Sequence, residues 1–485
     1  MRGALFFLAA ALGGFSILLI LPVLIGLLLD DHQLAMRFGL YMTLGVFVSA
    51  AGLLSLSGTP IRLSRIGGFV LIVAVWLSWA VLATVPFLDM ADLPPVRAFF
   101  EAVSGLTTSG ASVITNKEPL PTVLLLFRSQ LEWMGGFLTI CMVVLILAPA
   151  GAGGLPERPL VIYQRGNEGA VRQVWHIIRQ IGLIYVSTTL LCSIGLMLTG
   201  TSPASAANLA MMAVATGGFT IFNGSLDSQV SASGLVVMTI FLFVGASNVF
   251  WLSAIRNGRW SQVVKFREPF ILTGIALALA IIIGAELRIV GSSVPIGDLI
   301  AESLFNAISL ISTSGVESRP GVFALLSVPA LLFVILFGGS SFSTAGGIKL
   351  YRLGAMAAQS LRELNRLVYP SIVQNRQFGR AKLEMSVVNA VWSYFAVATT
   401  TVFVGIFALA ASGLRFSEAV TASVAFFANA GPFYQAAAFQ SSQALVAFAD
   451  FSDAALLVGA IIMLFGRLEV IVLLGAITYL ISLRR

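Results

Sequence analysis

The chain alternates long apolar runs with short apolar pieces that end in small polar residues. Each long run holds about 18 or more residues, enough for a helix to cross a hydrocarbon layer about 30 Å thick. The pattern therefore predicts ten membrane-spanning helices, over residues 4–29, 38–58, 66–88, 121–148, 181–200, 230–255, 269–290, 323–350, 386–411 and 452–482.

Four shorter apolar pieces lie between these runs, over residues 99–106, 204–215, 300–311 and 419–428. At about 1.5 Å per residue, a helix of this length crosses only about half of a bilayer. A small polar row ends each piece: TTSGAS, ATGGFT, STSGVE and ANAGPF. We therefore predict four re-entrant half-helices, each followed by an extended polar row.

The four rows align on one glycine each. These glycines are Gly110, Gly218, Gly315 and Gly431, which lie about 100 residues apart. In the last two units a glutamate, Glu302 or Glu418, precedes the glycine by the same interval. One such row is typical of an ordinary extracellular turn, but four at similar spacing indicate a repeated unit of span, half-helix, row and span.

These repeats predict an all-α polytopic membrane protein with four span–pore-helix–span units around a pseudo-fourfold central pore, plus two extra N-terminal transmembrane helices. We assign residues 1–65 to the two-helix extension, 66–150 to repeat 1, 151–256 to repeat 2, 257–352 to repeat 3, 353–385 to a cytoplasmic linker and 386–485 to repeat 4.

Composition agrees with a membrane protein. The 485 residues have a mean hydropathy of +0.97, and 10% of them are charged, against about 25% in soluble proteins. The run over 4–29 is too long for the core of a signal peptide, which predicts an uncleaved first span. Cys141 and Cys192 lie inside apolar runs and form no disulfide framework. His32 and His176 lie far apart, which argues against a histidine-based metal site.

Positive charge predicts the orientation of the chain. Most of the 28 Lys and Arg residues lie in the N-terminus, the C-terminus and the segments 59–67, 151–180, 256–268 and 349–384. Loops rich in Lys and Arg stay on the cytoplasmic side of a membrane. We therefore expect both termini to be cytoplasmic and the four polar rows to approach from the outer side.

The rows have the chemistry of an ion filter. Irregular backbone at membrane depth must be buried in protein or line a wet cavity. The C-terminal ends of half-helices favour a cation, and rings of backbone carbonyls can replace the water shell of an alkali cation. The rows hold no carboxylate ring of the kind that divalent-cation pores use. The predicted filter consists of Thr108, Ser109 and Gly110; Thr216, Gly217 and Gly218; Thr313, Ser314 and Gly315; and Asn429, Ala430 and Gly431.

Three further stretches give the chain a resemblance to a known family. They are FRSQLEWMGGFLTI at 127–140, FGGSSFSTAGGIKLYR at 337–352 and GRLEV at 466–470. With the rows, they make the chain similar, over essentially its whole length, to the TrkH-type branch of the Trk/Ktr/HKT superfamily of potassium transporters. Row 3 departs from the family at Val316, and row 4 at Ala428 and Ala430.

The resemblance implies potassium uptake across a bacterial inner membrane, with K⁺ as the transported ion and the four filter glycines favouring K⁺ over Na⁺. It also implies a homodimer on a cytoplasmic ring of TrkA-type subunits that bind NAD or ATP. The chain itself has no nucleotide-binding fingerprint, so no nucleotide is expected on it. The basic loops 151–180 and 351–384 are the expected docking surfaces, and the alternative is that they only fix the orientation of the chain in the membrane. No nucleic acid is expected as a partner.

A charge and a glycine-rich break lie inside two of the predicted spans. Arg467 is too far from either end of its span to reach water, so it needs a partner or a wet cavity. A structural bond to Glu469 or to a carbonyl is the alternative to a role in the pore. The break at 338–349 is either a cavity lining or a flexible cytoplasmic loop. The resemblance implies an inner gate that consists of Gly338, Gly339, Gly346, Gly347, Lys349 and Arg467.

Arg128 and Glu132 lie four residues apart, and we predict that they form an ion pair within the helix or between repeats. The chain shows no paired carboxylates at metal spacing and no nucleophile with a base, which argues against an enzyme. An alternating-access symporter is the alternative to a cation permease. Such transporters usually have two inverted halves, whereas these four repeats share one orientation.

Overall fold

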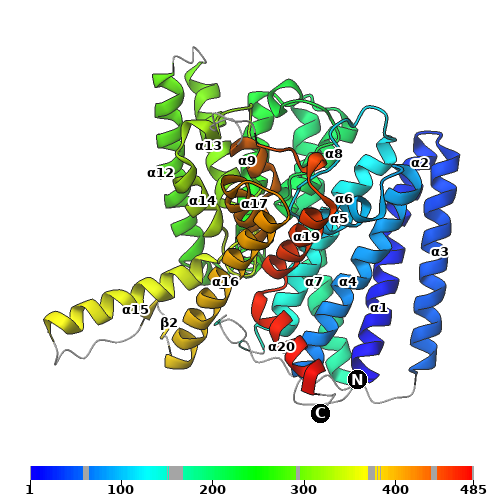
Figure 1. Ribbon diagram of the computed structural model, residues 1–485, viewed down its shortest axis with the longest axis horizontal. Coiled ribbons are helices and arrows are strands. Elements are labelled where there is room, and N and C mark those ends of the chain that lie inside the picture. Colours follow the sequence, from blue (N-terminus) through cyan, green and yellow to red (C-terminus); the bar gives the residue numbers. More distant parts are fainter. Residues whose placement is uncertain are drawn as a thin grey trace.

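A computed structural model describes residues 2–57, 65–149, 151, 154, 168–290, 295–369, 377–378, 381–382, 384–437 and 445–482. These residues form an almost entirely helical protein (Figure 1). A short antiparallel pair, β1 (Gln377–Phe378) with β2 (Ala381–Lys382), is the exception. Parts of the basic loops 151–180 and 351–384 lie outside the described residues.

Seven helices among the described residues are long and apolar enough to cross a membrane. They confirm seven of the ten predicted spans: Gly3–Leu28, His32–Ser55, Ile66–Met90, Thr122–Leu147, Arg172–Leu198, Glu268–Ile289 and Met385–Ala411. The protein is therefore a multi-pass membrane protein. The start of the first helix and the end of the last lie at the same end of the molecule (Figure 1).

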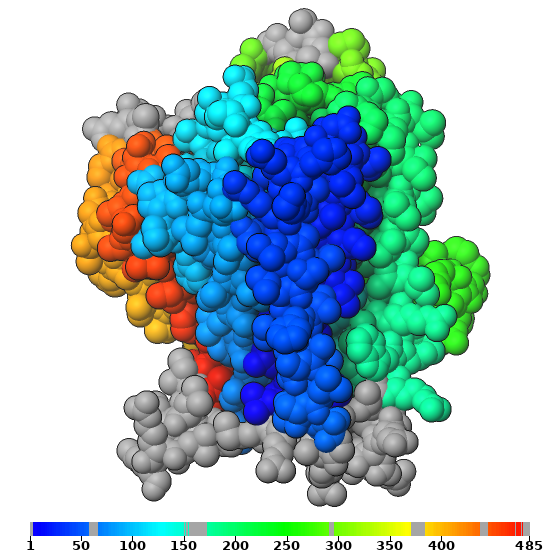
Figure 2. Space-filling view, turned by 90° about the vertical axis from the view of Figure 1, so that its right-hand side faces the viewer, coloured from blue at the N-terminus to red at the C-terminus, as the bar shows by residue number. Residues whose placement is uncertain are grey.

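The N-terminal extension flanks the rest of the molecule. It consists of α1 (Arg2–Leu18), α2 (Ile20–Leu28) and α3 (His32–Ser55), which form the dark blue surface in Figure 2. Two side-chain donors join α1 to its neighbours: Ser49 Oγ donates to the Ala9 carbonyl at 2.7 Å, and Trp79 Nε1 donates to the Ala11 carbonyl at 3.2 Å.

Each repeat begins with a long helix and continues into a short one. The long helices are α4 (Arg65–Met90), α7 (Glu168–Leu198), α12 (Glu268–Ile289) and α16 (Met385–Ala411). The short pore helices are α5 (Pro95–Leu106), α8 (Pro203–Ala215), α13 (Ile296–Ile311) and α17 (Phe416–Ala428). Prolines at or just before the first turn of three pore helices fix their starts, because a first-turn residue needs no amide donor. The four predicted half-helices are confirmed.

The second helices of the repeats differ in length: in repeats 2 to 4 they end inside the predicted span, whereas in repeat 1 helical structure continues to Leu147. These helices are α6 (Thr122–Met142), α9 (Ala232–Ala246), α14 (Val328–Leu336) and α19 (Asp453–Arg467). A π-helix, η1 (Val143–Leu147), continues α6. After α9, α10 (Val249–Arg256) turns away by 109°, and α20 (Val470–Ser482) follows α19 after a break.

The prediction of uninterrupted spans over 230–255, 323–350 and 452–482 is therefore wrong. Hydropathy measures how apolar a segment is and does not detect a helix end inside an apolar run. At the first break, the Asn248 side chain accepts from Phe250 N and starts a new helix. At the last, Glu469 adopts a left-handed backbone with φ of +58°.

The pore helices close the four repeats into a ring. Each packs against helices of its own repeat and against the second helix of the preceding one: α8 against α6, α13 against α9, α17 against α14 and α5 against α19. The last of these contacts joins repeat 4 to repeat 1. This arrangement fits the predicted pseudo-fourfold pore, and the repeat boundaries themselves stay a prediction.

The remaining elements are short helices within the repeats and the longer helix α15. They are η4 (Leu226–Ser228), α11 (Trp260–Val263), η5 (Phe323–Leu325), α15 (Leu350–Val368), α18 (Gly431–Ala437) and η7 (Phe448–Asp450). Among them, α15 projects away from the bundle (yellow in Figure 1). Row 4 differs from the other rows because it continues directly into α18.

Candidate functional site: filter rows and inner gate

Each pore helix is followed by a residue with the same left-handed backbone conformation. At the first filter position the backbone is left-handed, with φ of +58° at Thr108, +52° at Thr216, +63° at Thr313 and +54° at Asn429. This conformation is uncommon for residues other than glycine and unusual for β-branched threonine. It costs about 1–3 kcal/mol per residue and persists only where the surroundings impose it. Its fourfold recurrence indicates one turn geometry used four times.

A glycine of each second helix or its extension meets the carbonyl of the residue four positions before the filter glycine, in the last turn of the pore helix. A Cβ atom on Gly135 would lie 1.7 Å from the Leu106 carbonyl oxygen. The equivalent distances are 2.7 Å from Gly245 to Val214, 2.8 Å from Gly338 to Ile311 and 2.0 Å from Gly466 to Phe427. Any larger residue would push the pore helix away, so these four glycines set how deeply the rows enter the protein.

The rows meet one another at the centre of the ring. A Cβ atom on Gly110 would lie 2.6 Å from the Cα atom of Gly218, and Gly431 N donates to the Ser109 carbonyl at 2.6 Å. Ser314 Oγ donates to the Gly217 carbonyl. The structure thus brings all four predicted rows together, and two of their carbonyls accept hydrogen bonds from neighbouring rows.

A cavity of about 410 Å³ opens at the glycines of the rows. Gly110, Gly218 and Gly315 line its floor, and Lys117 lines its wall. The Lys117 amine donates to Thr220 Oγ1 at 2.6 Å and to the Phe222 carbonyl at 2.9 Å. Burial, and then the nearby Arg128, lower the pKa of Lys117 to about 8, while Glu101 opposes the shift. A titratable positive charge therefore faces the entrance to the rows.

Polar side chains of three pore helices hold the backbone just after the filter glycine. The Glu101 carboxylate accepts from Val113 N at 3.0 Å, Asn208 Nδ2 donates to the Phe219 carbonyl at 2.9 Å, and Asn306 Oδ1 accepts from Ser318 N at 3.0 Å. All three are fully buried. Sequence analysis missed these residues, although a polar residue nine or ten positions before each of these glycines is a detectable signal.

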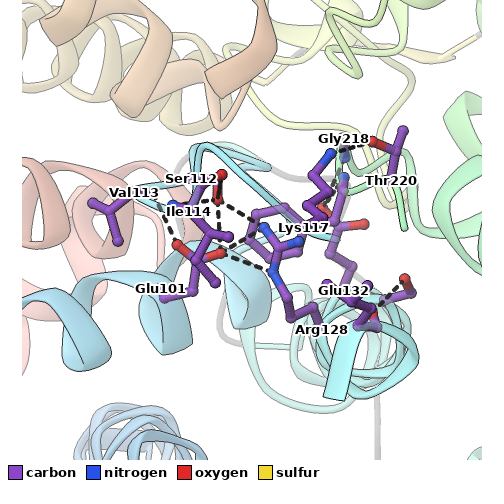
Figure 3. Close-up of polar contacts among 12 residues, drawn as sticks. Glu101, Ser112, Val113, Ile114, Lys117, Arg128, Glu132, Gly218 and Thr220 are labelled. Atoms are coloured by element: carbon purple, nitrogen blue, oxygen red, sulfur yellow. Dashed lines mark hydrogen bonds and ion pairs between the residues drawn. The ribbon is translucent and has the colours of Figure 1, made fainter. Parts of the chain in front are cut away.

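Arg128 and Glu132 have different partners from those predicted. The Arg128 guanidinium pairs with Glu101 of its own repeat at 2.6 Å and lies over the Phe219 ring, 4.1 Å from its centroid (Figure 3). Glu132 Oε1 accepts from Gly218 N at 2.8 Å and from Phe219 N at 2.9 Å. The predicted Arg128–Glu132 ion pair is thus wrong, because each side chain supports a filter row instead.

The glycine-rich segment 338–349 is buried and lies against the ends of three pore helices. Thr344 Oγ1 donates to the Val214 carbonyl at 3.1 Å, Gly339 N donates to the Ile311 carbonyl at 2.9 Å, and a Cβ on Gly346 would lie 1.9 Å from the Ala428 carbonyl oxygen. The alternative of a flexible cytoplasmic loop is therefore wrong. The segment also closes the end of α9, where Ser340 N donates to the Ala246 carbonyl at 2.9 Å.

Arg467 bonds to this same segment. Its Nη1 donates to the Thr344 carbonyl at 2.6 Å, and the residue is 3% exposed. Glu469 pairs instead with Arg352, whose guanidinium lies 3.7 Å from the centroid of the Tyr394 ring. Of the two structural alternatives for Arg467, the carbonyl bond is present and the Glu469 pair is not.

The predicted gate residues lie together. A small cavity of about 20 Å³ is lined by Gly346, Gly347, Lys349 and Arg467, along with Thr139 of α6. The Lys349 amine donates to the Ala345 carbonyl inside the segment. Two buried basic side chains from different repeats, Lys349 and Arg467, therefore line the same cavity. Gly338 and Gly339 do not line this cavity and lie instead against Ile311, the last residue of α13.

Comparison with known proteins agrees with this geometry. The family model for TrkH, a cation transport protein, matches residues 41–267 and 263–480. The Trk system potassium uptake protein TrkH of Vibrio parahaemolyticus is 30% identical over 424 residues, 85% of each chain. The protein of the same name from Halomonas elongata is 28% identical over 473 residues, 94% of each chain. The crystal structure of the potassium transporter TrkH from Vibrio parahaemolyticus gives a TM-score of 0.84 at 28% identity, covering 98% of this chain and 97% of that one.

Proposed function

The chain belongs to the TrkH family of cation transport proteins, and we propose that it takes up potassium ions through the four rows. The fourfold left-handed turn at the first filter position is the observation that carries the proposal. A turn that costs conformational energy four times over, at the meeting point of four half-helices, has the function of presenting backbone oxygens to one axis.

The filter in this proposal consists of the twelve residues predicted from the sequence, with K⁺ as the ion that their oxygens receive. The oxygens approach a desolvated cation from four directions, and the C-terminal ends of the pore helices add partial negative charge. The relatives named as potassium uptake proteins support K⁺ as the ion.

The inner gate in this proposal is the segment 338–349 together with Arg467. Two observations support it: the segment is buried beneath the ends of three pore helices, and Arg467 is bonded to its Thr344 carbonyl. A cation that leaves the rows toward the cytoplasm would pass this positive charge. Movement of the segment, with Arg467 attached, would open the path.

We also propose a bacterial inner-membrane location, cytoplasmic termini, a homodimer and a TrkA-type cytoplasmic partner that binds NAD or ATP. The relatives' names refer to a Trk system, which supports assembly with other components. The projecting helix α15 offers a docking surface, since Leu361, Leu364 and Leu367 on it are exposed. Native mass spectrometry of the membrane-extracted protein tests the dimer, and a strictly monomeric yet active species contradicts it.

Flux measurements test the proposed function directly. The purified chain is placed in liposomes, and the uptake of radioactive Rb⁺, a K⁺ substitute, is compared with that of Na⁺. We expect Rb⁺ to enter faster than Na⁺ and external K⁺ to compete with it. Equal entry of both ions, or no entry of either, contradicts the proposal.

A further inference from the structure

Glu132 places a carboxylate directly behind filter row 2. The side chain reaches from α6 of repeat 1 to the row of repeat 2, where one oxygen, Oε1, accepts from Gly218 N and Phe219 N (Figure 3). Glu132 is fully buried. Its second oxygen, Oε2, has no hydrogen-bond partner among the residues that the structure describes. One side chain therefore holds two successive amides of a filter row.

The sequence of row 2 makes room for this carboxylate. Row 2 has Gly217 at its middle position, whereas the middle residues of rows 1 and 3 are Ser109 and Ser314. A Cβ atom on Gly217 would lie 2.4 Å from Glu132 Oε2. Because the carboxylate is tied to two backbone amides, it cannot move aside cheaply. Gly217 and Glu132 therefore fit each other, and a side chain at the middle position of row 2 would displace Glu132 from the two amides.

The other three repeats have no acid at this place. Glu132 lies three residues before Gly135, the glycine that meets the pore-helix carbonyl. Three residues before the equivalent glycines lie Leu242, Ile335 and Met463, all of them fully buried. Leu242 belongs to the same apolar cluster as Val316, which follows the glycine of row 3. Glu132 is thus an acid at a position that is apolar in the other three repeats.

The two amide bonds orient the carbonyls of row 2. In a trans peptide group the N–H and the C=O point in opposite directions. Since Gly218 N–H points at Glu132, the Gly217 carbonyl points away from it, and the Phe219 N–H fixes the Gly218 carbonyl in the same way. The Gly217 carbonyl does meet Ser314 of row 3, on the side away from Glu132. Donation of both N–H groups to Glu132 also polarises the peptide groups, which makes their oxygens better cation ligands.

We propose that Glu132 is the specificity-determining residue of row 2, which orients the Gly217 and Gly218 carbonyls through their peptide groups. This inference rests on the proposed function, because it assigns a role within the filter. Glu132 acts through the row and does not touch the ion.

Two substitutions test this role, with the purified full-length chain in liposomes. Glu132→Gln keeps an oxygen that accepts both amide bonds. It should leave the half-saturating Rb⁺ concentration and the Rb⁺/Na⁺ ratio nearly unchanged. Glu132→Leu, the side chain of repeat 2, leaves two buried amides without an acceptor and should lower the Rb⁺/Na⁺ ratio by roughly tenfold.

The matched control is Met463→Leu, an apolar exchange at the same register of repeat 4, which should leave both quantities unchanged. Thermal unfolding of each variant in K⁺ and in Na⁺ gives a second readout. The wild type should be stabilised more by K⁺, and the Leu variant should lose part of that difference. If Glu132→Leu does not fold, Gly217→Ala decides the matter, because its Cβ atom would lie 2.4 Å from Glu132 Oε2 and displace that side chain, with the same expected fall in the Rb⁺/Na⁺ ratio.

A wild-type Rb⁺/Na⁺ ratio in Glu132→Leu overturns the inference, as does a Gln variant that loses as much selectivity as the Leu variant, because Gln keeps the acceptor oxygen. A Leu variant that melts at a lower temperature yet keeps its Rb⁺/Na⁺ ratio also overturns it, because Glu132 would then only stabilise the fold. Failure of the proposed function is a different result: wild-type protein that fails to prefer Rb⁺ over Na⁺. Wild-type protein that prefers Rb⁺, beside unaffected Glu132 variants, rejects the role of Glu132 alone.

Discussion

The outer and inner halves of the repeats differ in how closely they follow fourfold symmetry. In the outer half, all four rows share a left-handed first residue, and all four pore helices meet a glycine at the same carbonyl. In the inner half, each second helix continues differently: as a π-helix, as a helix turned by 109°, as a buried coil or as a second helix after a break. Coordination of an ion needs several equivalent ligands, whereas a gate needs only one element that moves.

The strongest test of this contrast removes the inner charge. A cation near Arg467 meets a repulsion of order 1–4 kcal/mol at a few ångströms, which corresponds to roughly five- to thousandfold in rate if it limits flux. Arg467→Ala should therefore raise Rb⁺ flux in liposomes and leave the Rb⁺/Na⁺ ratio nearly unchanged. Deletion of part of 338–347 should act in the same direction. Unchanged flux in a well-folded variant removes the barrier role, and loss of folding favours a structural role for the bond to Thr344.

Enlarging a contact glycine tests the symmetric half. Gly135→Ala places a Cβ atom 1.7 Å from the Leu106 carbonyl, so we expect the free energy of unfolding to fall by about 3 kcal/mol. Gly245→Ala should cost less, since its Cβ would lie 2.7 Å from the Val214 carbonyl. Thermal unfolding in detergent measures both. Gly274→Ala is the control, because no atom lies within 4 Å of its added Cβ. Equal stability of all three variants contradicts the close packing described for the rows.

Substitution of a filter glycine should have a smaller effect, which is specific to ion selectivity. Gly110 has φ of +70° and touches Gly218, so Gly110→Ser strains row 1 and crowds the axis. We expect the Rb⁺/Na⁺ permeability ratio to fall by about tenfold, as expected when about 1.4 kcal/mol of discrimination is lost. Gly218→Ser and Gly315→Ser should act likewise. Wild-type ratios in all three variants remove the filter assignment.

The smallest expected effect concerns Lys117 in the cavity at the glycines of the rows. With a pKa lowered to about 8, its amine is protonated and positive below that pH and becomes neutral as the pH rises through it. A cation entering the cavity then meets less repulsion, so Rb⁺ uptake at low concentration should rise a few-fold between external pH 7 and 9. Lys117→Met should remove this rise and keep the high-pH rate. A Lys117→Met variant with the same pH profile as wild type excludes the lysine as its cause.

The sequence predicted the parts of the fold that depend on local pattern. Apolar runs located seven continuous spans, and polar rows after half-length apolar pieces located the four pore helices. It did not predict the helix ends inside 230–255, 323–350 and 452–482, because these segments are apolar on both sides of the break. The glycines at 338–347 did signal irregular backbone, since a run of glycines disfavours a helix.

Side-chain partners across repeats could not be predicted. The spacing of Arg128 and Glu132 favoured an ion pair between them. In the structure Arg128 pairs with Glu101 instead, and Glu132 accepts from the backbone of row 2. Likewise, Glu469 lies two residues from Arg467 but pairs with Arg352. A buried charge needs a partner nearby in the folded protein. That partner can lie on another helix, far away in the sequence, so the spacing along the chain does not identify it.

The contact of α19 with α5 closes a ring made by one polypeptide. In a pore built from four identical subunits, any change in one gene appears four times around the axis. Four buried carboxylates behind four rows would repel one another and raise the cost of folding. Here a single codon places one acid behind one row, and its three counterparts stay apolar. Fusion of the four units therefore lets mutation adjust the filter one quarter at a time.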